Sequence, residues 1–341
     1  MGSAPIFMPL WAIVRTSTFL MPSIYRRCDD VLYSLYQRLI LFFFFTCTRV
    51  EVYLHGNTDV SRKENIVFIC NHQSTVDWTV ANLLAVQNGS LGHIRYILKD
   101  GLKFLPIYGF YFRQHGGIYV KRDKKFDEAK TRKDVKEIKD RKTPVWLVIF
   151  PEGTRFNPTL QTVVERSKQF AEREGLQVLE NVLTPRVKAL QISLQELVGH
   201  VTAVYDVTIA YSNTKDPSGT RIASPGMPDF LMGSSSQLHL FLERCDIESI
   251  PQESRQLQEW LHNQFLKKDR LLTDFYAENK TTDLMGPGKR LDISYKETVP
   301  AFCFWAVCLA GILFTNKGQT FYWKSLLTST LGGVFWMSFR S

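Results

Sequence analysis

The chain has 341 residues, enough for one sizeable domain with a full hydrophobic core plus accessory segments. Lys and Arg number 42 against 33 Asp and Glu, so the formal net charge is +9, which favours nucleic acid, an anionic membrane or a phosphorylated substrate as partner. Among these, the aromatic content of 13% favours a membrane. The six cysteines have the paired spacing of neither a disulfide framework nor a zinc site, which predicts reduced thiols and a soluble part that faces the cytosol.

Two apolar segments open the chain, residues 6–25 and 31–47. Each is interrupted by one arginine, Arg15 in the first and Arg38 in the second. Such side chains can extend to the membrane surface, which suits helices that lie partly in one leaflet. Because no small-residue cleavage site follows the first segment, we interpret it as a retained helix and not as a signal peptide. Residues 1–50 are therefore predicted to form membrane-associated helices.

From residue 51 to 285 the pattern alternates between short β-rich runs and helical stretches. The β-rich runs are residues 64–70, 93–99, 116–122, 144–150, 203–211 and 237–247. The helical stretches are residues 77–87, 127–140, 163–175 and 254–278. This alternation predicts an α/β domain with a mixed, largely parallel sheet flanked by helices.

The C-terminal residues 286–341 contain two further apolar segments, 299–314 and 321–339. The first is shorter than the roughly twenty residues that a perpendicular transmembrane helix needs. A polar linker, "TNKGQT", joins them, so we predict a hydrophobic hairpin that is either tilted across the bilayer or re-entrant.

The stretch "NHQSTVDW", residues 71–78, directly follows the predicted strand at 64–70. Ligand-handling residues of open α/β sheets lie at such strand ends. On one continuous helix, His72 and Asp77 would be separated by about 500 degrees of rotation, so His72 should precede a helix and Asp77 should lie in its first turn. Ser74 or Thr75 is the predicted N-cap of that helix. Asp77 could then orient the imidazole of His72 and leave its other nitrogen as a base; a purely structural pair is the alternative.

A protein nucleophile for such a base is not evident in the sequence. There is no G-x-S-x-G motif, and Cys70 should point away from Asn71 into the core because side chains alternate along a strand. We therefore predict that the nucleophile is a hydroxyl of the substrate, with His72 as general base.

Two predicted strands end in groups that suit a phosphate. "VWLVIFPEGTR" ends in Gly153, Thr154 and Arg155, which offer close backbone approach, a hydroxyl and a guanidinium fork. "GGIYVKR" ends in Lys121 and Arg122. Surface turns with ion pairs would look the same in sequence, but two basic strand ends beside a possible base favour a phosphate-bearing substrate. Nucleic-acid binding is disfavoured, because the basic residues do not line one helix or groove.

Four short blocks, "NHQSTVD", "GGIYVKR", "FPEGTR" and "LTPR", occur in this order between residues 71 and 186. Together they resemble the four blocks of the glycerolipid acyltransferases, a family that includes the 1-acylglycerol-3-phosphate (lysophosphatidate) acyltransferases. The resemblance extends over residues 55–285 and implies an α/β domain on N-terminal membrane-embedded helices. It implies transfer of an acyl group from acyl-CoA to the sn-2 hydroxyl of lysophosphatidic acid, giving phosphatidic acid.

The resemblance also implies roles for single residues. His72 would deprotonate the acceptor hydroxyl, Asp77 would orient His72, and Lys99 would stabilise the oxyanion. The substrate-binding residues would be Asn71, Lys121, Arg122, Glu152, Gly153, Thr154, Arg155 and Pro185. Most of these would hold the glycerol phosphate, whereas Pro185 would help shape the acyl-CoA side. Tyr119 departs from many relatives and is expected to pack inside the protein.

No metal or redox cofactor is implied, and acyl-CoA would be a co-substrate. The expected partners are acyl-CoA, lysophosphatidic acid and a phospholipid membrane, with the endoplasmic reticulum as the expected location and the mitochondrial outer membrane or nuclear envelope as alternatives. Other acceptors, such as lysocardiolipin or lysophosphatidylinositol, stay open. So do an acyl-CoA thioesterase and a non-catalytic membrane protein. Of the other histidines, only His115, just before "GGIYVKR", lies near a block.

Overall fold

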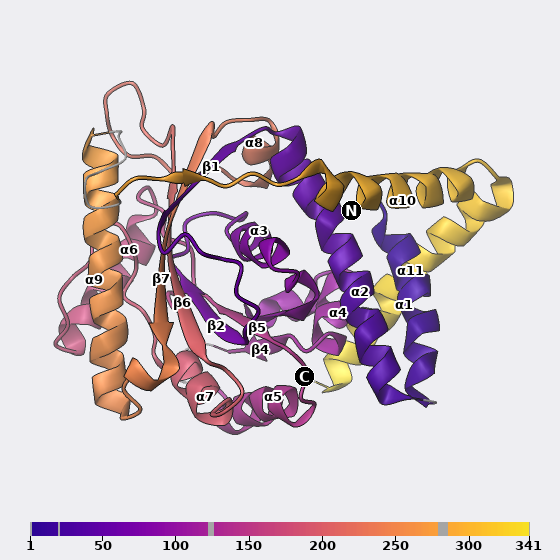
Figure 1. Ribbon diagram of the computed structural model, residues 1–341, viewed down its shortest axis with the longest axis horizontal. Helices are drawn as coiled ribbons and strands as arrows, with labels where there is room; N and C mark the ends of the chain where they lie inside the picture. Colours follow the sequence, from indigo (N-terminus) through magenta and orange to yellow (C-terminus); the bar gives the residue numbers. More distant parts are fainter. Residues whose placement is uncertain (1, 20, 122–125, 279–285, 341) are drawn as a thin grey trace.

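An eight-stranded sheet forms the centre of the molecule in the computed structural model, which describes residues 2–19, 21–121, 126–278 and 286–340 (Figure 1). The strand order is β4-β3-β5-β2-β6-β7-β1-β8. Their bounds are β1 Glu51–Gly56, β2 Ile66–Cys70, β3 Ile94–Lys99, β4 Ile118–Val120, β5 Trp146–Ile149, β6 Ala203–Tyr211, β7 Gln237–Asp246 and β8 Lys289–Arg290. Neighbouring strands are parallel except in the pairs β6/β7 and β1/β8, which confirms the predicted mixed, largely parallel sheet.

Helices cover both faces of this sheet, as predicted. Side chains of β2 alternate between the faces: Ile66, Phe68 and Cys70 join one hydrophobic cluster, and Val67 and Ile69 join the other. The first cluster is completed by α3 (Trp78–Gln87), α4 (Tyr108–Gln114) and the N-terminal helices, the second by α5 (Glu128–Asp140), α7 (Lys188–Glu196) and α9 (Ser254–Glu278). Two further helices, α6 (Gln161–Arg173) and α8 (Met227–Leu231), lie in the connections around the sheet.

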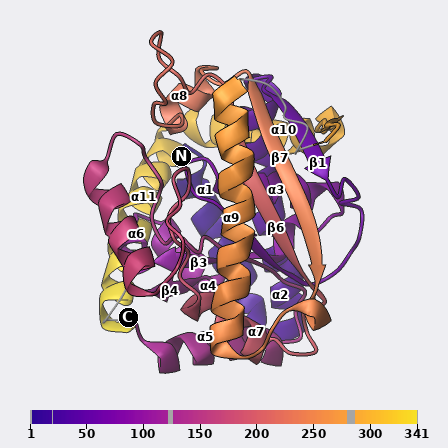
Figure 2. The same cartoon turned by 90° about the vertical axis from the view of Figure 1, so that its left-hand side faces the viewer.

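Helix α9 lies lengthwise over β6 and β7 (Figure 2). A buried ion pair fastens it there, because Lys268 Nζ lies 2.5 Å from Asp206 Oδ1 and donates to the carbonyl of Val207 at 2.8 Å. Burial raises the pKa of Asp206, and the neighbouring lysine opposes that rise. Toward the C-terminal end of α9, Tyr276 reaches the loop after β2, where its hydroxyl donates to Gln73 Oε1 at 3.0 Å.

The N-terminal segments are helical, as predicted, but their bounds differ. Helix α1 is Ala4–Thr16, and α2 is Pro22–Leu41, continued by a π-helical stretch, Phe42–Cys47. The second helix thus begins nine residues before the predicted apolar segment. It includes Asp29 and Asp30, whose charges hide the helix in a search for apolar runs: Asp29 is buried against His115 and Asp30 binds Arg95.

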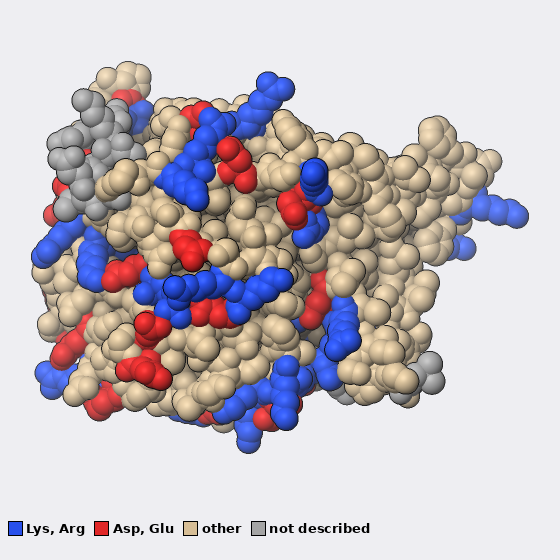
Figure 3. Space-filling model, in the orientation of Figure 1, with Lys and Arg blue, Asp and Glu red and all other residues tan. Residues whose placement is uncertain are grey.

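The predicted C-terminal hairpin consists of α10 (Tyr295–Leu313) and α11 (Asn316–Arg340). They form the projection on the right of Figures 1 and 3, which carries few charged side chains. Of the described helices, the segments Pro22–Cys47 and Tyr295–Leu313 are long and apolar enough to cross a membrane. Exposed large apolar side chains continue along α11 at Phe321, Trp323, Leu327, Leu331, Phe335 and Phe339. The division of the chain into domains at residues 50 and 285 stays a prediction.

Candidate active site

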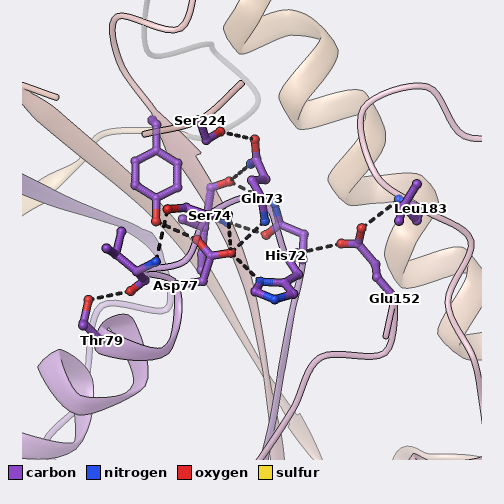
Figure 4. Close-up of polar contacts among 12 residues, drawn as sticks. His72, Gln73, Ser74, Asp77, Thr79, Glu152, Leu183 and Ser224 are labelled. Atoms are coloured by element: carbon purple, nitrogen blue, oxygen red, sulfur yellow. Dashed lines mark hydrogen bonds and ion pairs between the residues drawn. The ribbon is translucent and has the colours of Figure 1, made fainter. Parts of the chain in front are cut away.

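The loop after β2 places His72 against Asp77, as predicted (Figure 4). His72 Nδ1 lies 2.8 Å from Asp77 Oδ2. Because a carboxylate only accepts, Nδ1 carries the proton in the neutral imidazole, and Nε2 is left as the basic nitrogen. The side chain of His72 is 23% exposed and that of Asp77 is fully buried. A substrate can therefore reach His72, whereas the carboxylate that holds it is shielded from solvent.

Asp77 is surrounded by hydrogen-bond donors. Its Oδ2 also accepts from the backbone amides of Gln73 at 2.7 Å and Ser74 at 2.8 Å, and its Oδ1 accepts from the hydroxyl of Tyr211 at 2.6 Å. These bonds satisfy a buried negative charge and fix the carboxylate relative to His72.

The predicted N-cap is wrong. The residue that precedes α3 is Asp77 itself, and neither Ser74 nor Thr75 caps the helix. The hydroxyl of Ser74 instead donates to the carbonyl of Pro225 and accepts from the amide of Val76 at 3.1 Å. The loop turns back on Asp77, so its first amides point at that carboxylate and not at a serine or threonine cap.

Asn71, a predicted substrate-binding residue, is buried and joins the loop to β6. Its Nδ2 donates to the carbonyl of Ile209 at 3.0 Å, and its Oδ1 accepts from the amide of the same residue at 2.7 Å. These contacts support a structural role for Asn71 at the root of the loop. Its contact with substrate stays a prediction.

The turn after β5 lies directly beside His72. One carboxylate oxygen of Glu152 accepts from the backbone amide of His72 at 2.7 Å, and the other accepts from that of Leu183 at 2.9 Å. The chain of the turn returns to the same place, since the amide of Phe156 donates to the carbonyl of His72 at 2.7 Å. Burial raises the pKa of Glu152, although the two amide donors oppose the rise. These contacts support Glu152 as a residue that positions His72, and its predicted contact with the headgroup stays untested.

The remaining residues of this turn lie nearer to solvent. Gly153 has φ of +67°, a conformation that favours glycine, and it lets the chain reverse after Glu152. Thr154 is half-buried and Arg155 is exposed. The ring of Phe150 lies 4.4 Å from that of His72, centroid to centroid, so an apolar surface adjoins the base.

The "LTPR" block adjoins the same turn. Pro185 is buried, and the amide of Arg186 donates to the carbonyl of Pro151 at 2.8 Å. Leu183, the first residue of the block, is the second amide that Glu152 binds. Three of the four blocks therefore meet around His72.

The fourth block lies farther away. Lys99 ends β3 and Lys121 follows β4; both are exposed, and Lys99 pairs with Val120 in register. Strand β5 separates β3 from β2, which places Lys99 roughly 10 Å from the strand that leads to His72 and Lys121 one strand beyond it. Arg122 lies outside the described residues. Tyr119 packs inside the protein, as predicted: it is buried, and its hydroxyl donates to the carbonyl of Gly109 at 2.8 Å.

His115 belongs to a different part of the molecule. It is buried, its Nδ1 lies 2.6 Å from Asp29 Oδ2 on α2, and its Nε2 lies 2.6 Å from an Nη of Arg95 on β3. Asp29, Asp30 and His115 are close enough for a metal ion, but the guanidinium of Arg95 already contacts Asp30 and His115. This cluster joins the second N-terminal helix to the α/β domain.

Sequence reasoning missed four residues of the site: Gln73, Tyr211, Arg221 and Tyr276. Tyr211 and the backbone amide of Gln73 bind Asp77, and Arg221 and Tyr276 both donate to the side-chain oxygen of Gln73. Two of them had a signal in sequence: Gln73 lies within the block "NHQSTVD", and Tyr211 is the last residue of a predicted strand.

Cys70 has the geometry of a core residue. It is fully buried, it faces the cluster that contains Phe68, and burial, with the nearby charge of Asp77, raises the pKa of its thiol. Cys70→Ser should therefore keep most of the acyl-transfer activity that the sequence motifs imply. Loss of activity together with an acyl adduct on Cys70, detected by mass spectrometry of the wild type, would contradict this.

Comparison with known families places these residues in context. A family model described as Acyltransferase matches residues 51–212, and one described as Acyltransferase C-terminus matches residues 229–305. The mouse protein named 1-acyl-sn-glycerol-3-phosphate acyltransferase epsilon is 41% identical over all of this chain and 94% of its own length. An Arabidopsis thaliana protein named probable 1-acyl-sn-glycerol-3-phosphate acyltransferase 5 is 35% identical, over 85% of this chain and 72% of its own. The crystal structure of the LPA acyltransferase PlsC from Thermotoga maritima aligns with a TM-score of 0.43 at 18% identity, covering 82% of this chain and 95% of that one.

Proposed function

This chain belongs to the acyltransferase family, and we propose that it transfers an acyl group from acyl-CoA to the sn-2 hydroxyl of lysophosphatidic acid, which gives phosphatidic acid. The names of its relatives support this acceptor. The observation that carries the chemistry is the contact of 2.8 Å between His72 and Asp77, with the other nitrogen of an accessible imidazole left as a base.

The reaction needs one proton shuttle and no covalent enzyme intermediate. His72 Nε2 takes the proton of the acceptor hydroxyl while its oxygen attacks the thioester carbonyl. The tetrahedral intermediate then collapses and its carbon–sulfur bond breaks. The imidazolium of His72 gives its proton to the departing CoA thiolate. Asp77 stays ionised and balances the transient positive charge on His72.

Proximity supplies much of the rate. Positioning two substrates can contribute roughly 7–11 kcal/mol of barrier lowering. Lys99 is the proposed oxyanion donor, and it is exposed at the carboxyl end of the sheet. The exposed apolar surfaces of α10 and α11 support a location at a membrane, where the acyl chains of both substrates can stay in lipid while the reacting groups approach His72. The proposed location is the endoplasmic reticulum, with the catalytic domain in the cytosol.

Transfer from labelled acyl-CoA by purified protein tests the proposal, with lysophosphatidic acid, lysophosphatidylinositol and lysocardiolipin as acceptors. Formation of labelled phosphatidic acid is the expected result. Thiol release from acyl-CoA that is equally fast without any lysolipid would instead indicate a thioesterase. Activity on another lysolipid alone would keep the mechanism and replace the acceptor.

Arg155→Ala should raise the KM for lysophosphatidic acid by roughly 10–100-fold, because a hydrogen bond to a charged group contributes about 1.5–3 kcal/mol. Arg155 is exposed at the turn beside His72, whereas Glu152 in the same turn is occupied by backbone amides. The KM for acyl-CoA should change much less. Arg173→Ala, which removes an exposed arginine at the end of α6, is the matched control. Equal increases for both substrates would count against a headgroup role.

A further inference from the structure

The segment of residues 213–228 lies over the loop that carries His72. One matched family model ends at residue 212 and the other begins at residue 229, so neither match includes this segment. It nevertheless contacts the loop twice near its end: Pro225 accepts from the hydroxyl of Ser74, and Ser224 donates to Gln73 Oε1 at 3.1 Å (Figure 4). The loop with the base is therefore held from a part of the chain that lies between the two family-model matches.

Gln73 is the residue on which these contacts converge. It is 4% exposed, and its Oε1 accepts three hydrogen bonds, from Arg221 at 2.7 Å, Tyr276 at 3.0 Å and Ser224 at 3.1 Å. Its Nε2 donates to the carbonyl of Ile209 at 2.5 Å. Its backbone amide donates to Asp77 Oδ2, the same oxygen that His72 binds. Fixing the side chain of Gln73 thus fixes one of the donors that hold the partner of the base.

Arg221 is itself held by several contacts, so it can fix the side chain of Gln73. Its guanidinium carbon lies 3.8 Å from the ring centroid of Tyr276 and 4.8 Å from that of Phe156. One terminal nitrogen bonds to Gln73 and the other to Asn181 Oδ1. Asn181 lies two residues before Leu183, whose amide binds Glu152. Arg221 therefore connects the His72 loop, the "LTPR" block and α9.

We propose that Arg221 is a positioning residue of the acyl-transfer site, which keeps His72 and Asp77 in register by fixing Gln73. Both terminal nitrogens of the guanidinium are engaged with protein groups, and Nε is buried. This distinguishes it from Arg155, whose side chain is exposed. The planar fork matters more than the charge, because it bonds to two acceptors while its face lies on an aromatic ring. The inference rests on the proposed function for the reaction that it affects.

The test compares Arg221→Lys and Arg221→Gln with the wild type in steady-state acyl transfer, using whichever lysophospholipid the wild type acylates fastest. Both variants should lower kcat on the order of 10²-fold, the size of effect that a displacement of about 1 Å in a catalytic group can have. The KM values for the lysolipid and acyl-CoA should stay within a factor of about two. Arg255→Gln is the matched control: this arginine lies on α9 with an 86% exposed side chain, and its variant should behave as the wild type does.

Three outcomes would overturn the inference: unchanged kcat in both variants, full activity of Arg221→Lys alone, or a raised KM for the lysolipid at unchanged kcat, which would make Arg221 a headgroup ligand. Should the Arg221 variants fail to fold, Tyr276→Phe removes one donor to Gln73 Oε1 and leaves the ring under the guanidinium. It should lower kcat in the same way, though less, and an unchanged kcat would again count against the inference. If the wild type transfers acyl groups only to another lysolipid, the proposed acceptor is contradicted. The comparison of the Arg221 variants with the wild type then stays valid with that lysolipid as acceptor.

Discussion

Replacing His72 with alanine should lower the rate of acyl transfer by on the order of 10²–10⁴-fold, the contribution of a general base. The structure gives two reasons to expect the upper part of this range. First, the imidazole is held in place by a buried carboxylate at 2.8 Å and by the ring of Phe150. Second, the side chain of His72 is 23% exposed, so a substrate can approach it. The KM values should change little, because the base contributes to the transition state more than to substrate binding.

Initial rates of transfer from labelled acyl-CoA, at saturating concentrations of both substrates, measure this effect. His93→Ala is the matched control, since His93 lies before β3 at the opposite, amino end of the strands. Thermal unfolding should show both variants folded. Transfer by His72→Ala at near the wild-type rate would exclude His72 as the base and would point to a base supplied by the substrate or by another residue.

The sheet could be predicted from the sequence because most of its strands are short, apolar and separated by helical patterns. The strand β1 could not, because it is only six residues long and its neighbour β7 lies nearly two hundred residues away in the chain. Such a short segment becomes a strand because it pairs with another strand, and the sequence of the segment alone does not show that pairing. Strand β8, with two residues, is a stronger case of the same limit.

In the site, too, contacts between residues close in sequence could be predicted and contacts between distant residues could not. His72 and Asp77 are five residues apart, so a turn of the chain after a predicted strand was enough to pair them. The contacts of Gln73 with Arg221 and Tyr276 join residues 148 and 203 positions apart. Their geometry depends on how α9 packs on the sheet and on how the segment 213–228 folds over the loop. Glutamine, arginine and tyrosine are also common surface residues, so their types alone gave no signal.

Glu152 shows that the place of a motif is easier to predict than the contacts of each residue in it. The turn "FPEGTR" was predicted to lie near the base and it does, but the acid within it is buried and both of its oxygens bind backbone amides. A buried carboxylate is itself a poor neighbour for a phosphate, because like charges repel strongly where water is excluded. Arg155, the one exposed cation of this turn among its described residues, is better placed to meet a headgroup.

Glu152→Gln should therefore affect catalysis and stability more than substrate binding. The amide of glutamine keeps one acceptor oxygen and turns a donor toward the other backbone amide, so either His72 or Leu183 loses its partner. A buried donor without a partner costs about 1–3 kcal/mol, which should lower the Tm, and the shift of His72 should lower kcat on the order of 10²-fold. Thermal unfolding and steady-state kinetics measure the two effects.

Glu172→Gln is the control for this substitution, because Glu172 is an exposed glutamate on α6. It should leave the Tm and both kinetic constants unchanged. If Glu152→Gln instead kept the wild-type Tm and kcat and raised only the KM for lysophosphatidic acid, the carboxylate would have to contact the substrate. The decisive comparison is with Arg155→Ala. A binding defect in Arg155→Ala and a catalytic defect in Glu152→Gln would show that two residues of one turn serve the substrate and the base separately. The reason would be that the side chain of Arg155 faces solvent, whereas that of Glu152 binds the backbone of His72.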